Sequence, residues 1–294
     1  MFDFIRKCFD VLKHVEGENM SYYRELSNPW VKAQKFQDVK VSDLLKRAKK
    51  RLEKRSEPQK NPAWVFDLDS TLFCTGPRNQ KVFWKFLQKQ EEFPKHWGLL
   101  WQQMGPAVQQ YSIPRTFYSV LRSFGWSPDE ARAEAKAIWD AYQGHWMEEF
   151  FKSQNIAHDP AYPGAVEFVR AILEMENEVI YLTGRDSPRA MEGTLHALKM
   201  AGFPLGNGTH LRLKPVQEMG DLDFKLKASS RMKSEFEVIG LLENEPENLV
   251  MFAKLFPDAE IVFYHSIMSA RHPEKDIRDY MNGRPLWKLD NFSS

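Results

Sequence analysis

Cysteine and long apolar runs are the two scarcest features of this chain of 294 residues. Its two cysteines, Cys8 and Cys74, are too few for a disulfide framework and lack the spacing of a zinc site, which favours a reducing compartment. No uninterrupted apolar run approaches the roughly 18 residues of a membrane-spanning helix. The first fifteen residues carry charges throughout, unlike a signal peptide. We therefore expect a cytoplasmic protein without a transmembrane segment.

A charge excess of either sign is also missing, because 41 Lys and Arg balance 40 Asp and Glu. The overall charge therefore gives no argument for a nucleic acid or an anionic membrane as partner. Locally, residues 40–60 hold nine basic residues against three acids. No aromatic residue interleaves them as base stacking requires, so a solvated helix face is the favoured interpretation and phosphate binding the alternative.

What the chain does contain, from residue 63 onward, is short β-branched and aromatic runs that alternate with helical patterns. This alternation is typical of βαβ units around a parallel sheet. Right-handed crossovers then predict a doubly wound α/β fold with strand order 3-2-1-4-5, in which ligands bind beyond the carboxyl ends of the strands. The predicted strands span 63–67, 178–183, 210–214, 237–242 and 260–265.

Helical patterns fill the intervals between these strands. An amphipathic helix is expected over residues 3–15, and another over 164–176. Three more helices are expected to begin at a serine cap, near Ser42, Ser127 and Ser187, and the first of these to break at residues 56–58.

An interval of about 90 residues separates the first two strands, which is too long for a plain crossover. It is rich in aromatic residues and helical patterns, so we interpret residues 73–160 as an inserted helical cap that folds over the sheet. Such lids exclude water and select substrates. Residues 61–72 and 161–294 would form the Rossmann-like core, and residues 1–60 an N-terminal helical extension.

Two carboxylates, Asp67 and Asp69, end the first apolar strand. An isolated buried carboxylate is costly, so this pair needs a metal ion, a cation or a cage of hydrogen bonds. Polar residues also end the second and fourth strands, and all of these strand ends meet at one edge of the sheet. The residues expected there are Asp67, Asp69, Thr183, Gly184, Lys225 and Glu243.

In their order and spacing, these elements resemble the haloacid dehalogenase-like superfamily, in its phosphatase branch. The matching elements are Asp-x-Asp-x-Thr at 67–71, the threonine after the second strand, a lysine before the fourth strand and an acidic cluster that begins at Glu243. The likeness covers residues 63 to about 265, with the insertion where the family has a helical cap. Residues 1–60 fall outside it.

The resemblance implies a Mg²⁺-dependent phosphatase that cleaves a small phosphorylated metabolite through an aspartyl-phosphate. Asp67 would be the nucleophile, and Asp67, the Asp69 carbonyl and Glu243 would bind Mg²⁺. Asp69 would be the general acid and base, with a pKa raised by neighbouring negative groups. Thr183, Gly184 and Lys225 would hold the phosphoryl group and share the catalytic work.

Several assignments remain open at this level. The family usually has aspartates where this chain has Glu243, Asn244 and Glu247, so the direct metal ligand among these three is undecided. Lys214 and Lys227 compete with Lys225 for the role of the fixed cation. Arg185 and Asp186 would pair with each other or cap the next helix, and Arg78 would either be solvated or meet a second anionic group of the substrate.

Other functions compete with a phosphatase. A phosphomutase needs the same residues, and a polynucleotide 3′-phosphatase is suggested only by the basic segment at 40–60. A dehalogenase is disfavoured because Asp69 supplies an acid that halide displacement does not use. A non-catalytic binding protein on the same fold is suggested by the glutamates of the fourth strand.

Overall fold

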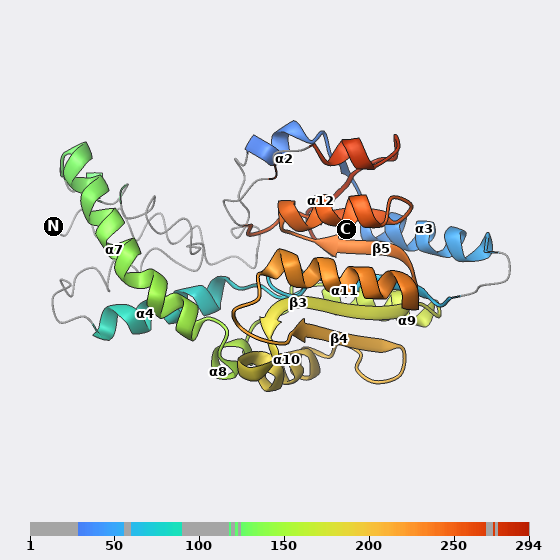
Figure 1. Cartoon of the computed structure of the whole chain (residues 1–294), viewed down its shortest axis with the longest axis horizontal. Coiled ribbons are helices and arrows are strands. Elements are labelled where there is room, and N and C mark those ends of the chain that lie inside the picture. The colour runs from blue at the N-terminus through green and yellow to red at the C-terminus, as the bar shows by residue number, and fades with distance from the viewer. Residues whose placement is uncertain are drawn as a thin grey trace.

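A single parallel sheet forms the centre of the molecule. The computed structural model describes residues 29–55, 60–89, 118, 121–122, 125–268, 273 and 276–293 (Figure 1). In this part of the chain, seven strands pair in the order β1-β7-β6-β5-β2-β3-β4, and every pairing is parallel. The five predicted strands are confirmed, and so is their mutual order, as β2 (Pro62–Phe66), β3 (Glu178–Asp186), β4 (Thr209–Lys214), β5 (Glu237–Glu243) and β6 (Glu260–Tyr264).

Two further strands extend the sheet beyond β6. They are β7 (Trp287–Leu289) and, outside it, β1 (Gln37–Asp38). Sequence analysis missed both because two or three residues are too few to show the period of two on which strand prediction depends.

Helices cover both faces of the sheet, as expected for a doubly wound fold. Along β2, Trp64 and Phe66 point into one apolar cluster, and Ala63 and Val65 point into the other. On the first face lie α3 (Val41–Glu53), α9 (Ala165–Glu174) and α10 (Ser187–Ala201). On the second face lie α2 (Pro29–Ala33), α11 (Asp221–Glu235) and α12 (Pro246–Leu255), with the short helix η3 (Ile277–Tyr280) beside α12.

A close contact between β2 and β5 fixes the packing of the first face. The indole of Trp64 is fully buried, and Gly240 of β5 lies against it. A Cβ atom on Gly240 would lie 2.5 Å from Cζ2 of Trp64, which is well inside van der Waals contact. The absence of a side chain at residue 240 therefore makes room for the indole.

Two longer helices lie apart from the sheet. They are α4 (Gly76–Lys89) and α7 (Pro128–Glu149), which share an apolar cluster of their own, and α7 is followed by the short α8 (Ser153–Ile156). The arrowheads of β3, β4 and β5 point toward the side where α4 and α7 lie (Figure 1). Helix α7 begins at the predicted Ser127 cap, where Ser127 and Glu130 form a reciprocal capping box. The extent of the cap at 73–160 stays a prediction.

The other two serine caps are wrong. Helix α3 begins at Val41, and its N-cap is Lys40, which makes no side-chain cap. Helix α10 is capped by Asp186, whose carboxylate accepts a hydrogen bond from the Arg189 amide at 3.2 Å. Aspartate caps as well as serine does, so the residue before Ser187 takes the role. The expected helix at 3–15 and the break at 56–58 lie outside the described residues.

None of the helices in the described ranges is both long enough and apolar enough to cross a membrane.

Candidate active site

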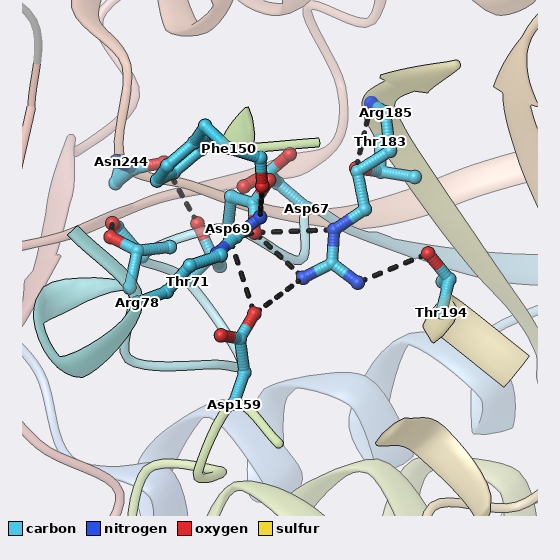
Figure 2. A network of polar contacts seen from close by, with 12 residues as sticks. Asp67, Asp69, Thr71, Arg78, Phe150, Asp159, Thr183, Arg185, Thr194 and Asn244 are labelled. Atoms are coloured by element: carbon cyan, nitrogen blue, oxygen red, sulfur yellow. Dashed lines mark hydrogen bonds and ion pairs between the residues drawn. The ribbon is translucent and has the colours of Figure 1, made fainter. Parts of the chain in front are cut away.

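The carboxyl ends of the central strands bring the predicted residues together (Figure 2). The amide of Asp67 donates a hydrogen bond of 3.0 Å to the Leu242 carbonyl, which fixes the end of β2 against the end of β5. Thr183 lies on β3, the strand on the other side of β2. Both Asp67 and Thr183 are buried, so their side chains need internal partners.

Of the three candidate lysines, Lys225 is the one that contacts Asp67. From α11, its Nζ donates hydrogen bonds to Oδ1 of Asp67 at 2.8 Å and to Oε2 of Glu243 at 2.9 Å. The two rival lysines lie elsewhere: Nζ of Lys214 contacts the carbonyls of a neighbouring loop, and Lys227 is exposed. Although burial opposes a charged lysine, the nearby carboxylates keep the pKa of Lys225 well above its ordinary value.

The carboxylate of Glu243 is fully occupied by internal hydrogen bonds. Its Oε1 accepts from the amides of Asn244 and Glu245, both at 3.0 Å. Its Oε2 accepts from Lys225 and, at 3.3 Å, from Nδ2 of Asn248. A carboxylate offers about four lone-pair sites, and here four donors use them. The predicted metal ligand Glu243 therefore serves to hold Lys225 and the loop that follows β5.

Unlike the carboxylate of Glu243, the amide oxygen of Asn244 keeps a lone pair that no hydrogen bond among the described residues uses. Its Nδ2 donates to the carbonyl of Ile267, which fixes the orientation of the amide. Its Oδ1 accepts a hydrogen bond of 3.0 Å from Oγ1 of Thr71, in the loop that follows β2. An amide oxygen has a second lone pair, which leaves one site on Oδ1 for another partner.

Several side-chain and main-chain oxygens at the ends of β2 and β5 are of the type that binds a hard cation such as Mg²⁺. Within the described ranges, no group of three or more His, Cys, Asp or Glu residues is arranged to hold a metal ion. Oxygen donors of the kind that Mg²⁺ prefers are present at the strand ends in the Asp67 carboxylate, the Asp69 main-chain carbonyl and the Asn244 amide oxygen. Burial, reinforced by the charge of Glu243, raises the pKa of Asp67 to about 8 despite Lys225. A divalent cation beside Asp67 would favour its ionised form.

Asp69 has cationic neighbours, contrary to the sequence prediction. Its Oδ1 accepts hydrogen bonds from Nε and Nη2 of Arg185, at 3.2 and 2.6 Å, and from Nη2 of Arg78. Burial acts to raise the pKa of Asp69, but the two guanidinium groups outweigh it and hold that pKa well below its ordinary value. The expected rise caused by negative neighbours is therefore wrong.

Two site residues that sequence reasoning placed elsewhere are Arg78 and Arg185. Both guanidinium groups are completely buried, which excludes a solvated role for Arg78. Arg185 contacts Asp69 and Asp159 instead of Asp186, which caps α10. The signal for Arg185 was its position directly after Thr183-Gly184. Arg78 was considered as a solvated residue or a substrate contact but not as a partner of Asp69, and nothing local marked Asp159.

Gly184 lies close to the side chain of Asp221. A Cβ atom on this residue would lie 2.8 Å from Cγ of Asp221, in the first turn of that helix. The neighbouring hydroxyl of Thr183 accepts a hydrogen bond of 3.3 Å from the Arg185 amide. The roles of Thr183 and Gly184 in binding a phosphoryl group stay predictions.

The basic segment lies at the other end of the sheet. In α3 and just after it, Arg51 and Arg55 form ion pairs with Glu237, at 3.7 and 2.9 Å. Glu237 is the first residue of β5 and Glu243 the last, so about 20 Å of strand separates this contact from the candidate site. Nothing in this placement favours a nucleic acid as substrate.

Comparisons with known proteins give structural likeness only. No protein-family model matches the chain, and no curated protein matches its sequence. Three of the similar solved structures illustrate this likeness. A haloacid dehalogenase-like hydrolase from Streptococcus pneumoniae is 12% identical, covers 79% of this chain and 94% of its own, and has a TM-score of 0.41. A structure described as a predicted phosphatase from Clostridium acetobutylicum is 11% identical, covers 79% of this chain and 95% of its own, and has a TM-score of 0.42. A class C acid phosphatase from Bacillus anthracis with tungstate bound is 17% identical, covers 78% of this chain and 69% of its own, and has a TM-score of 0.41.

Proposed function

We propose that this chain is a phosphatase of the haloacid dehalogenase-like class that hydrolyses a small phosphomonoester. The observation that carries the proposal is the buried Asp67, which follows the central strand β2 and is paired with Lys225 through a hydrogen bond of 2.8 Å. A carboxylate with one oxygen bound to a fixed cation can present its other oxygen as a nucleophile. The descriptions of similar solved structures as phosphatases support the same class.

The reaction would proceed in two steps on Asp67. In the first, Oδ2 of Asp67 forms a bond to phosphorus as the bond between phosphorus and the leaving oxygen breaks. Asp69, protonated because the negative charge of the bound phosphoryl group counteracts its two arginines, gives that oxygen a proton. In the second, water attacks the aspartyl-phosphate, Asp69 takes the proton from the water, and phosphate leaves with Asp67 restored. Lys225 and the Thr183 hydroxyl would hold the phosphoryl oxygens.

A magnesium ion would be held by the carboxylate of Asp67, the main-chain carbonyl of Asp69 and Oδ1 of Asn244. When bound, it would neutralise the negative charge of the phosphoryl group. In this chain Asn244 takes the place that the sequence suggested for Glu243, because the four lone-pair sites of Glu243 already have donors.

Hydrolysis of a generic aryl phosphate by the purified protein tests the function. We expect turnover in millimolar Mg²⁺ and its loss when the metal is removed by a chelator, because the charge on the substrate is then no longer neutralised. A protein that binds Mg²⁺ yet hydrolyses neither aryl nor alkyl phosphates would contradict the proposal. It would favour a non-catalytic binding protein.

Replacing Asn244 should test the choice of metal ligand. Asn244→Ala removes the proposed amide ligand, and we expect it to weaken Mg²⁺ binding at least about tenfold, measured by calorimetry. Asn248→Ala is the matched control, because Asn248 is equally buried and contacts Glu243 but is no ligand. If Glu243→Gln weakened binding and Asn244→Ala did not, the ligand would be Glu243 after all.

A further inference from the structure

Three buried charged side chains and the partly exposed carboxylate of Asp69 form a closed ring beside Asp67 (Figure 2). Nη2 of Arg78 and Nη2 of Arg185 each contact Oδ1 of Asp69. The same two nitrogens each contact Oδ2 of Asp159, at 3.1 and 3.2 Å. Two guanidinium groups and two carboxylates therefore meet through one oxygen of each acid.

The ring needs Asp159 to keep its charges balanced. The side chains of Arg78 and Arg185 are fully buried, and that of Asp159 is 1% exposed. Two cations brought to a single carboxylate in such a place would repel each other, with one charge left uncompensated. An uncompensated buried charge is strongly unfavourable. Burial raises the pKa of Asp159 to about 7 despite the two arginines, and in its ionised form Asp159 supplies the second anion, so both arginines can stay at Asp69.

The contacts of the ring also orient Asp69. All three arginine hydrogen bonds go to Oδ1, and none of the hydrogen bonds among the described residues reaches Oδ2. The Asp69 side chain is 23% exposed, whereas its arginine partners are sealed from solvent. The ring therefore holds one oxygen of Asp69 inside and leaves the other for a reacting group.

Each arginine has an additional anchor outside the ring. Nη1 of Arg78 donates to the Phe150 carbonyl at 3.1 Å, and its guanidinium lies over the Phe150 ring at 3.9 Å. Nη1 of Arg185 donates to Oγ1 of Thr194 at 3.1 Å. These anchors do not depend on Asp159, so its replacement should loosen the ring without removing the arginines from the site.

We propose that Asp159 is a positioning residue, which acts through Arg78 and Arg185 to hold Asp69 with Oδ2 directed toward the leaving group. The proposal rests on the proposed function, because it assigns a task to the proton donor of that reaction. Asp159 lies in the segment that leads from α8 back to the sheet, and Arg78 lies on α4. Arg78 and Asp159, which belong to the helical segment between β2 and β3, would thus set the orientation of the Asp69 side chain at the end of β2.

The variant Asp159→Asn tests this role through the leaving group. It keeps the shape and an acceptor oxygen but removes the charge. We expect kcat for an alkyl phosphate to fall at least about tenfold, with KM nearly unchanged, because a poor leaving group needs a well-placed proton donor. An aryl phosphate with an acidic phenol needs that proton less, so its kcat should fall much less. Asp129→Asn, at an exposed residue of α7, should leave kcat unchanged for both substrates.

A double variant separates charge balance from a structural defect. Arg78→Gln combined with Asp159→Asn removes one cation together with the anion, which leaves Arg185 paired with Asp69. We expect this variant to hydrolyse the alkyl phosphate faster than Asp159→Asn alone. The inference would be overturned if Asp159→Asn lowered kcat equally for both substrates or did not lower it at all. It would also be overturned if the double variant hydrolysed the alkyl phosphate no faster than Asp159→Asn. A wild-type protein inactive on both substrates would instead overturn the proposed function.

Discussion

Asp67→Asn is expected to lower kcat for aryl phosphate hydrolysis at least about 1,000-fold, since an amide cannot replace the carboxylate nucleophile. The change keeps the shape of a side chain that is 5% exposed, and its amide oxygen can still accept the hydrogen bond from Lys225. The fold should therefore persist, as the thermal unfolding midpoint and circular dichroism would show. The exposed Asp129 provides the control, and Asp129→Asn should keep full turnover.

Trapping the aspartyl-phosphate intermediate is a second measurement that tests whether Asp67 is the nucleophile. Wild-type protein quenched in acid during turnover should gain the mass of one phosphoryl group, and a peptide that contains Asp67 should carry it. Asp67→Asn should gain none. Turnover that survives in Asp67→Asn, or a phosphoryl group found on another residue, would show that Asp67 is not the nucleophile.

Lys225→Met is expected to lower the free energy of unfolding by about 3–5 kcal/mol at neutral pH, because it leaves two buried carboxylates without their shared cation. Those carboxylates are Asp67 and Glu243, both nearly inaccessible to solvent. Urea denaturation would measure the loss. Lys227→Met, two residues further along α11 and exposed, is the matched control and should change the stability little.

The stability loss in Lys225→Met should depend on pH. Burial already raises the pKa of Asp67 and of Glu243, and without Lys225 both should rise further. The variant then keeps a proton on Asp67 at pH values where the wild type has released it, so the two proteins diverge in stability around and above the wild-type pKa of Asp67, about 8. We expect a smaller loss at acidic pH and a larger one as pH rises past 8. A loss independent of pH would indicate a packing defect instead.

The parts of the fold that follow from local pattern could be predicted from the sequence. The strands β2 to β6 are apolar runs between helical patterns, and their order follows from crossover handedness. The strands β1 and β7 could not be predicted, because two and three residues are too few to show the period of two. The cap at Ser187 failed because Asp186 accepts the hydrogen bond instead, and the cap at Ser42 failed because α3 begins at Val41 without a side-chain cap.

The site could be predicted where residue type and position in a strand determine its chemistry. Asp67 and Lys225 meet because strand ends and a helix start converge at one edge of the sheet. The ring around Asp69 could not be predicted, since Arg78 and Asp159 are 81 residues apart and belong to segments whose packing the pattern does not specify. Whether Glu243 binds a metal stays a prediction, and the hydrogen bonds that the turn after β5 donates to its carboxylate could not be foreseen from the sequence.

The contact between Trp64 and Gly240 couples the sizes of the residues allowed at two positions on neighbouring strands. The indole fills the space that a side chain at residue 240 would need, so neither position can change size alone. Over evolutionary time the pair should vary jointly: relatives with a larger residue at 240 should carry a smaller one at 64. An aligned set of relatives would reveal this dependence as correlated substitution between the two strands.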